Sequence, residues 1–285
     1  MVLALTVIVG GSSSASATQD HRGHRPPGSD TPSYLALGDS VTFGYREAAN
    51  LPTPTYPDAS SFVGYPEDVA SALGLRVANA SCPGETSTSF VTAGAPSNGC
   101  ENSPGGTPGY RQVFPLHVSY SGTQLQYAVG YLRHHRDTRV VSLMIGANDG
   151  FLCQETTADH CKSELPSVLT QIGANVKTIL SAIRGQAGYR GKIVILSYYS
   201  LNYSDPTQVA ESQGLNAAML GAAQPYRVTV ADGYGTFQAA AAQSSGDSCK
   251  AGLLTQLTTG GCGVHPSVGG QALLALAVEK AIAQH

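Results

Sequence analysis

The stretch Tyr34-Leu-Ala-Leu-Gly-Asp-Ser-Val41 joins a run of four apolar residues to a small polar turn. Four further short runs, rich in apolar or β-branched residues, follow at Arg76–Ala80, Val140–Ile145, Lys192–Leu196 and Val228–Val230. Such nearly continuous apolar runs are typical of strands that a parallel sheet buries on both faces. Residues 34–37 are therefore predicted to form the first strand of a five-stranded parallel sheet.

Longer stretches with helical character separate these strands. In the last of them, apolar residues recur at helical spacing from Ala272 to Ile282. The expected helices are Phe62–Leu73, Gln124–Arg133, Pro166–Arg184, Pro206–Ala222 and Val268–Ala283. Alternating strands and helices predict a three-layer α/β/α sandwich with right-handed crossovers. In such a sheet, functional groups lie just beyond the carboxyl ends of the strands.

Length and charge narrow the possible organisation. The chain has 285 residues with no linker-like segment in its middle, so we expect one domain over residues 32–285. Only 12% of the residues are charged, the net charge is −3, and no basic stripe is visible, which argues against nucleic-acid binding. Nothing suggests a coiled coil or an exposed apolar stripe, so we expect a monomer.

The first residues resemble an export signal. An apolar run at Met1–Val9, too short to span a bilayer, is followed by a Gly/Ser stretch and the small-x-small pattern Ala15-Ser-Ala17. We interpret residues 1–17 as a signal peptide; its usual basic beginning is missing, which favours a truncated start. Residues 18–31 are expected to be a disordered leader. The sequence thus predicts a secreted, extracellular protein without stable membrane insertion.

The six cysteines agree with export, because disulfides persist outside the cytosol. Six cysteines allow fifteen pairings. Their clustering favours the sequential pairs Cys82–Cys100, Cys153–Cys161 and Cys249–Cys262. A zinc site is disfavoured, because no C-x-x-C pair occurs and no histidine stands at ligand spacing from paired cysteines.

Four segments with small or polar residues follow the predicted strands. They are Gly38-Asp-Ser-Val41, Asn79-Ala-Ser-Cys-Pro-Gly84, Gly146-Ala-Asn-Asp149 and Gly263-Val-His-Pro266. A hydroxyl, an imidazole and hydrogen-bond donors at one sheet edge are what acyl transfer requires.

In this order, the four segments resemble the four blocks of the SGNH, or GDSL-type, esterase and lipase family, from about Tyr34 to the C-terminus. The resemblance implies a flavodoxin-like α/β/α fold and a carboxylic ester hydrolase that needs no cofactor or metal. It assigns Ser40 as nucleophile and His265 as general base. The Ser40 and Gly84 N–H groups and the Asn148 amide would form the oxyanion hole.

The chain departs from the family pattern before His265. Many members carry an aspartate three residues before the histidine, but here Cys262 occupies that position. We therefore expect a Ser–His dyad in which a backbone carbonyl near Gly263 accepts the His265 Nδ1–H. Asp232 or Asp247 is the alternative acid, although Asp232 reads better as a helix cap. Asp39 is expected to hold the nucleophile turn rather than to act as an acid.

The sequence favours one class of ester substrate without identifying it. Lipid-type or small-molecule esters are favoured over acetylated polysaccharides, because no carbohydrate-binding module accompanies the predicted domain. Tyr198, Tyr199 and Tyr203 follow the fourth strand, where they either wall an acyl pocket or pack the loop. A non-catalytic binding protein on the same scaffold is a further alternative. It is disfavoured because the full set of Ser40, Gly84, Asn148 and His265 is present.

Overall fold

The computed structural model describes residues 31–50 and 52–284. Five parallel strands form the central sheet in the order β2-β1-β3-β4-β5. They are β1 (Ser33–Gly38), β2 (Arg76–Asn79), β3 (Thr138–Met144), β4 (Lys192–Leu196) and β5 (Thr229–Ala231). The flavodoxin-like order and all five predicted strands are confirmed. The signal peptide and all but the last residue of the leader expected from the sequence lie outside the described residues.

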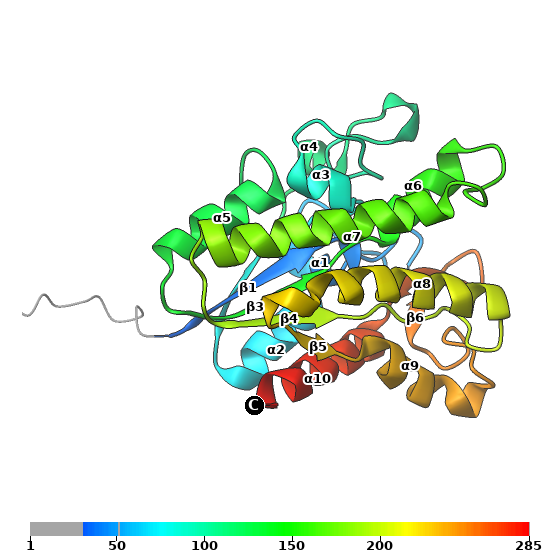
Figure 1. Cartoon of the computed structure of the whole chain (residues 1–285). Coiled ribbons are helices and arrows are strands. Elements are labelled where there is room, and N and C mark those ends of the chain that lie inside the picture. Colours follow the sequence, from blue (N-terminus) through cyan, green and yellow to red (C-terminus); the bar gives the residue numbers. More distant parts are fainter. Residues whose placement is uncertain (1–30, 51, 285) are drawn as a thin grey trace, which may run out of the picture. The chain divides into compact units, whose positions relative to one another are not determined.

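Helices cover both faces of the sheet (Figure 1). One layer contains α5, α7 and α8, and the other contains α2, α9 and α10. Their bounds are α2 (Tyr65–Leu73), α5 (Gln124–His134), α7 (Leu165–Ser181), α8 (Pro206–Ala223), α9 (Gly233–Ala241) and α10 (Val268–Ala283). The three-layer sandwich is therefore confirmed, although α9 is not among the helices expected from the sequence.

The predicted helix at Phe62–Leu73 begins later than expected, at Tyr65. Gly64 is its N-cap and Pro66 stands in the first turn, where a missing N–H costs nothing. Phe62 instead packs with Phe43 and Tyr110 in a small aromatic cluster beside the main core. This cluster supports the loop that leaves the first strand.

Short elements that the sequence analysis did not predict gather after the strands. They are α1 (Ser40–Phe43), α3 (Ser87–Val91), α4 (Tyr110–Val113), α6 (Ala147–Thr156), and an antiparallel pair, β6 (Leu254–Gln256) and β7 (Cys262–Pro266). All of them except α6 have three to five residues, which leaves little periodicity to read in a sequence. The ten-residue helix α6 buries only Asn148 and Cys153, so it has no apolar stripe that would predict it. Together these elements carry the predicted functional residues Ser40, Asn148 and His265.

All three predicted disulfides are present: Cys82–Cys100, Cys153–Cys161 and Cys249–Cys262. The first two lie in the segments that follow β2 and β3, and the third joins the segment after α9 to the first residue of β7. No described helix is both long and apolar enough to cross a bilayer. The three disulfides are compatible with a protein that works outside the cytosol.

Candidate active site

Ser40 is the first residue of the short helix α1, directly after strand β1. Asp39 caps this helix: its Oδ1 accepts the Val41 N–H at 3.0 Å, and its Oδ2 accepts the Tyr198 hydroxyl. Burial raises the pKa of the Asp39 carboxyl to about 6, although both hydrogen bonds favour its ionised form. The expectation that Asp39 holds the nucleophile turn is confirmed.

His265 lies on β7 and faces Ser40. Its Nε2 is 2.9 Å from Ser40 Oγ, a hydrogen-bond distance. Ser40 is only 8% exposed, so this contact is shielded from bulk water. The structure therefore brings together two predicted residues that are 225 positions apart in the chain.

The prediction of a Ser–His dyad supported by a backbone carbonyl is wrong. His265 Nδ1 lies 2.7 Å from a carboxylate oxygen, Oε1 of Glu47, rather than beside a carbonyl near Gly263. With this partner, Nδ1 carries the proton and Nε2 is free to accept one from Ser40. The three side chains thus form a Ser40–His265–Glu47 relay.

Gly263 explains why this carboxylate fits where no aspartate precedes the histidine. A Cβ at residue 263 would lie 2.0 Å from Glu47 Oε1, so only glycine leaves room for the carboxylate. Glu47 Oε1 also accepts the Val264 N–H at 3.1 Å, and its Oε2 accepts the Thr255 hydroxyl at 2.6 Å. Both strands of the β6–β7 hairpin are therefore bound to Glu47.

These contacts also set the charge of Glu47. Partial burial alone would raise the pKa of its carboxyl, but the hydrogen bond and charge of His265 and the Thr255 hydroxyl outweigh burial and lower it to about 2. Glu47 is thus ionised at neutral pH and suited to face an imidazolium.

The two alternative acids lie elsewhere. Asp232 is the N-cap of α9 and accepts the Gly235 N–H at 2.8 Å, as expected for a capping residue. Asp247 accepts the Lys250 N–H and pairs with the Lys250 ammonium at 3.3 Å. Neither contacts His265, so the suggestion that one of them serves as its acid is wrong.

Gly84 lies in a tight turn after β2. The Glu85 N–H donates to the Cys82 carbonyl at 3.1 Å, and Pro83 and Gly84 occupy the middle positions in the order typical of a type II turn. Gly84 has φ +79°, and a Cβ there would lie 2.4 Å from the Asn98 carbonyl oxygen. Only glycine satisfies both constraints.

Asn148 is held beside this turn. Its Nδ2 donates to the Glu85 carbonyl at 3.1 Å, and its Oδ1 accepts from Asn98 Nδ2 at 3.2 Å. An amide nitrogen has two protons, so one remains for a ligand. Within the described residues, no acceptor takes the backbone N–H of Ser40 or of Gly84.

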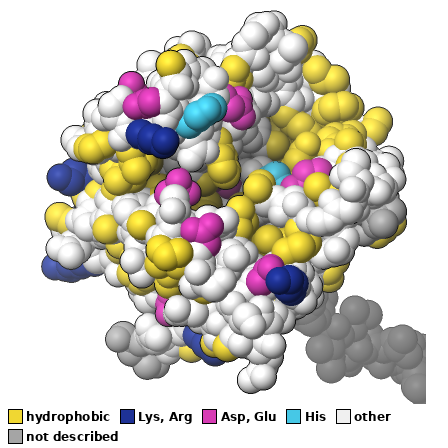
Figure 2. All heavy atoms as spheres, turned by 90° about the vertical axis from the view of Figure 1, so that its right-hand side faces the viewer, with side chains coloured by type: hydrophobic (Ala, Val, Ile, Leu, Met, Phe, Trp, Pro, Cys, Tyr) yellow, Lys and Arg dark blue, Asp and Glu magenta, His cyan; other side chains and the backbone are white. Residues whose placement is uncertain are grey.

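A cavity of about 220 Å³ opens at Ser40, Asn148 and His265. It extends between α6, α7 and α8, and most of its wall away from these residues is apolar: Phe151, Leu165, Val168, Leu169, Ile172, Leu215 and Val264. Figure 2 shows a hollow with hydrophobic side chains around it on this side of the molecule. Tyr198 and Tyr199 line the cavity; the Tyr203 hydroxyl instead donates to the Tyr234 carbonyl at 2.7 Å.

Two groups of described side chains have metal-like spacing, but both depend on cysteines. Cys82 and Cys100 accompany Glu85, and Cys153 and Cys161 accompany Glu164. All four sulfurs are in disulfides and therefore offer no thiolate to a metal. Neither group is a plausible metal centre.

The three-layer fold and the residues at its strand ends are those of an SGNH-type hydrolase. The profile of the GDSL-like Lipase/Acylhydrolase family matches residues 36–273, and the chain belongs to this family. It is accordingly a carboxylic ester hydrolase. A search of curated protein sequences finds no significant match.

Solved structures share the fold at low sequence identity. The acetylxylan esterase Axe2 from Geobacillus stearothermophilus is 17% identical, with a TM-score of 0.51 over 89% of this chain and 95% of its own. The α/β hydrolase LAE5 from the metagenome of Lake Arreo is 15% identical, with a TM-score of 0.51 over 88% and 94%. The lipase Lip_vut3 from a goat rumen metagenome is 16% identical, with a TM-score of 0.53 over 88% and 97%.

Proposed function

We propose that the protein cleaves carboxylic esters through an acyl-enzyme on Ser40, with His265 as general base and Glu47 as the acid that orients it. The single observation that carries this proposal is the relay from Ser40 Oγ to His265 Nε2, at 2.9 Å, and from His265 Nδ1 to Glu47 Oε1, at 2.7 Å. A nucleophile, a base and a group that orients the base are the three parts of an activated serine.

In the first half-reaction, Ser40 Oγ attacks the ester carbonyl carbon while its proton passes to His265 Nε2. The Glu47 carboxylate stabilises the imidazolium that forms. When the tetrahedral intermediate collapses, the bond to the alcohol oxygen breaks and His265 returns the proton to that oxygen. In the second half-reaction, a water molecule deprotonated by His265 attacks the acyl-enzyme, which releases the acid and regenerates Ser40.

The oxyanion would be held by the N–H groups of Ser40 and Gly84 and by Asn148 Nδ2. Ser40 supports this role because the first N–H groups of a helix have no partner within the helix. Asn148 fits the role of an oxyanion donor because only one of its two Nδ2 protons is bound to the Glu85 carbonyl. Removing one such donor typically lowers kcat by about 10²–10³.

The preferred substrates are esters with an acyl chain longer than acetyl. The support is the apolar wall that continues from Ser40 between α7 and α8, where Leu169 and Leu215 lie. Each methylene group that enters such a pocket contributes about 0.8 kcal/mol. An acetyl group would leave most of this wall unused, so lipid-type esters are favoured over acetylated polysaccharides.

We further propose that the protein acts outside the cell. The described residues contain three disulfides and no free cysteine. This arrangement is typical of proteins in an oxidising compartment. Mass determination of secreted protein after alkylation without reduction should find no modified cysteine. Modification of several cysteines would contradict the proposed location.

The deciding experiment is hydrolysis of p-nitrophenyl esters from acetate to palmitate, together with a phospholipid and acetylated xylan. We expect higher kcat/KM for octanoate than for acetate, and no hydrolysis by the Ser40→Ala variant. Full activity of Ser40→Ala would overturn the mechanism. A preference for acetate and acetylated xylan would identify an acetyl-polysaccharide esterase, and binding without turnover by the wild type would identify a non-catalytic binding protein.

A further inference from the structure

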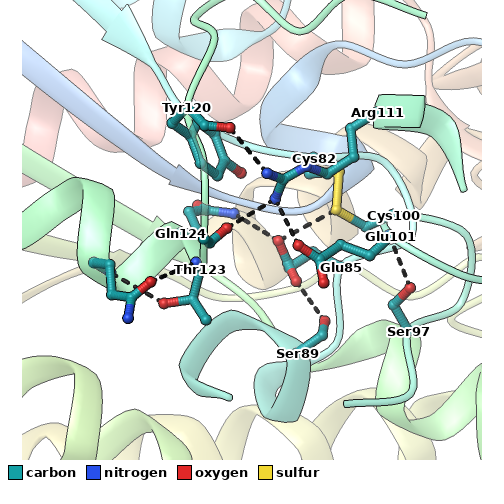
Figure 3. Close-up of polar contacts among 12 residues, drawn as sticks. Cys82, Glu85, Ser89, Ser97, Cys100, Glu101, Arg111, Tyr120, Thr123 and Gln124 are labelled. Atoms are coloured by element: carbon teal, nitrogen blue, oxygen red, sulfur yellow. Dashed lines mark hydrogen bonds and ion pairs between the residues drawn. A yellow bond between two sulfur atoms is a disulfide. The ribbon is translucent and has the colours of Figure 1, made fainter. Parts of the chain in front are cut away.

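A buried carboxylate lies directly behind the proposed oxyanion hole. Glu85 follows Gly84 in the chain and is only 2% exposed. Figure 3 shows its side chain pointing to Ser89 and Gln124, beside the Cys82–Cys100 disulfide. Neither Glu85 nor Gln124 lines the cavity at Ser40, so neither is positioned to touch a substrate there.

Gln124 connects this carboxylate to the strand that ends at the nucleophile. Its Nε2 lies 3.2 Å from Glu85 Oε2 and 2.9 Å from the Gly38 carbonyl, while its Oε1 accepts the Gly38 N–H at 2.7 Å. Gln124 is completely buried and therefore makes these bonds without competition from water. Gly38 is two residues before Ser40, so the amide fixes the backbone from which the nucleophile turn begins.

The backbone of Glu85 reaches the third proposed donor. Its carbonyl accepts Asn148 Nδ2 at 3.1 Å, which orients the amide, and its N–H closes the turn that presents Gly84. Glu85 is thus joined to every part of the proposed oxyanion hole: to Gly84 by the chain, to Asn148 by its carbonyl, and to the nucleophile strand through Gln124.

The surroundings hold this carboxylate in place. The Ser89 hydroxyl donates to Oε1, and the sulfur of Cys100 lies 3.4 Å from Oε2. Two charged groups act on this carboxyl from outside its hydrogen bonds: Glu101 raises its pKa and Arg111 lowers it. They form an ion pair with each other at 2.9 Å, and Tyr120 lies beside Arg111. A buried carboxylate costs free energy unless it is hydrogen-bonded, so its two donors are structurally required.

We infer that Glu85 and Gln124 form a positioning pair that fixes the distance between the Gly84 N–H and Ser40, and thereby the geometry of the oxyanion hole. This inference rests on the proposed function. Oxyanion donors act mainly in the transition state, so their displacement lowers kcat and leaves KM nearly unchanged. A misplacement of about 1 Å from groups remote from the chemistry can cost about 100-fold.

The test compares kcat and KM for p-nitrophenyl butyrate among wild type, Glu85→Ala, Glu85→Gln and Gln124→Ala. We expect kcat to fall about 100-fold in Glu85→Ala and Gln124→Ala, with KM within about twofold of wild type. Glu85→Gln keeps an acceptor for Gln124 and a partner for Ser89, so it should restore most of kcat. Glu101→Gln, which removes a neighbouring carboxylate that contacts neither Gln124 nor Gly38, is the matched control and should retain wild-type kcat.

Thermal unfolding of each variant separates positioning from folding. If Glu85→Ala does not fold, Gln124→Ala and Glu85→Gln decide the question. Wild-type kcat in a folded Gln124→Ala variant would overturn the inference, as would a Glu85→Gln variant that is folded but as slow as Gln124→Ala. Activity in Ser40→Ala would instead refute the proposed function itself, so the two failures are distinguishable.

Discussion

Glu47 and His265 are 218 positions apart in the chain, yet Glu47 Oε1 lies 2.7 Å from His265 Nδ1. The contact joins the loop after helix α1, which begins at Ser40, to the β6–β7 hairpin, which carries His265. Because Gly263 has no side chain, this carboxylate occupies the space beside the histidine. The arrangement supplies a charge partner for the imidazole although Cys262 stands where many relatives have an aspartate.

We predict that Glu47→Gln lowers kcat by about 10⁴, the loss typical when a triad carboxylate is replaced by its amide. The amide can no longer stabilise an imidazolium, and it can favour the wrong histidine tautomer. Steady-state kinetics on p-nitrophenyl butyrate would measure the effect. Asp232→Asn and Asp247→Asn are the matched controls and should keep most activity, because neither aspartate contacts His265.

Glu47 also binds the hairpin through Thr255, so the kinetic loss must be measured on folded protein. We expect circular dichroism spectra of Glu47→Gln and wild type to coincide at 25 °C. A folded Glu47→Gln variant within tenfold of wild-type kcat would show that His265 works without this carboxylate.

Gly84→Ala tests the turn that presents the second proposed oxyanion donor. The alanine Cβ would collide with the Asn98 carbonyl, and the alanine backbone would have to adopt φ +79°. We therefore expect the free energy of unfolding to fall by more than about 1 kcal/mol and kcat to fall at least tenfold. Gly105→Ala is the matched control: Gly105 has φ +81°, but a Cβ added there would meet no atom within 4 Å. Urea unfolding of Gly105→Ala should therefore show only the loss of stability that comes from its positive φ, and its kcat should equal that of wild type. Equal losses of stability and kcat in the two variants would contradict a special role for Gly84.

Leu169→Trp tests the apolar cavity. Leu169 lies on α7 in the cavity wall, and a larger ring there would shorten the space for an acyl chain. We expect the ratio of kcat/KM for octanoate to that for acetate to fall at least tenfold, since several methylene groups lose their contacts. Leu276→Trp, an exposed position on α10 in the opposite layer, should leave this ratio unchanged. An unchanged ratio in Leu169→Trp would place the acyl chain elsewhere.

The pH dependence of stability follows from buried carboxyls. Burial raises the pKa of Glu85 from 4.5 to about 7, partly opposed by hydrogen bonds from Ser89 and Gln124. Between these two values the folded protein binds more protons than the unfolded chain, so the free energy of unfolding decreases as pH rises. Asp39 and Asp149, each with a pKa raised to about 6 mainly by burial, act in the same direction up to that pH.

We therefore expect the free energy of unfolding of wild type to decrease from pH 4.5 to pH 7.5, with Glu85 contributing up to about 3 kcal/mol. Glu85→Gln cannot ionise and should reduce this decrease, which urea titrations at several pH values would measure. Identical pH profiles for Glu85→Gln and wild type would show that Glu85 does not titrate in this range.

Much of the site follows from sequence because parallel strands present their carboxyl ends at one edge. The segments around Ser40, Asn148 and His265 could be assigned to that edge from the alternation of strands and helices. Asp232 could be interpreted as a helix cap and Asp39 as a residue that holds the turn at Ser40. The positions of the predicted strands and helices, apart from the late start of α2, could be predicted from the pattern of apolar residues along the chain. Apolar patterns and helix caps depend on residues that are close in sequence, so the paths of the loops do not change them.

Glu47 could not be found in this way. It lies in no periodic segment and belongs to none of the four motifs; the one clue was the glycine at 263, which leaves space beside the histidine. Glu85 could not be predicted either, because its side chain is bonded to Gln124, which lies on a helix 39 positions further along the chain.

The sequence by itself determined the strands of the sheet and favoured the pairing of cysteines that the structure has. Through its resemblance to a known family, it also supplied the residues proposed as nucleophile, base and oxyanion donors. The tertiary structure alone decided which carboxylate faces His265 and which residues surround the buried acid Glu85 beside the Gly84 turn. The physical reason is that strand and cap signals depend on neighbouring residues, whereas a carboxylate's partner depends on how loops from different strands pack against each other.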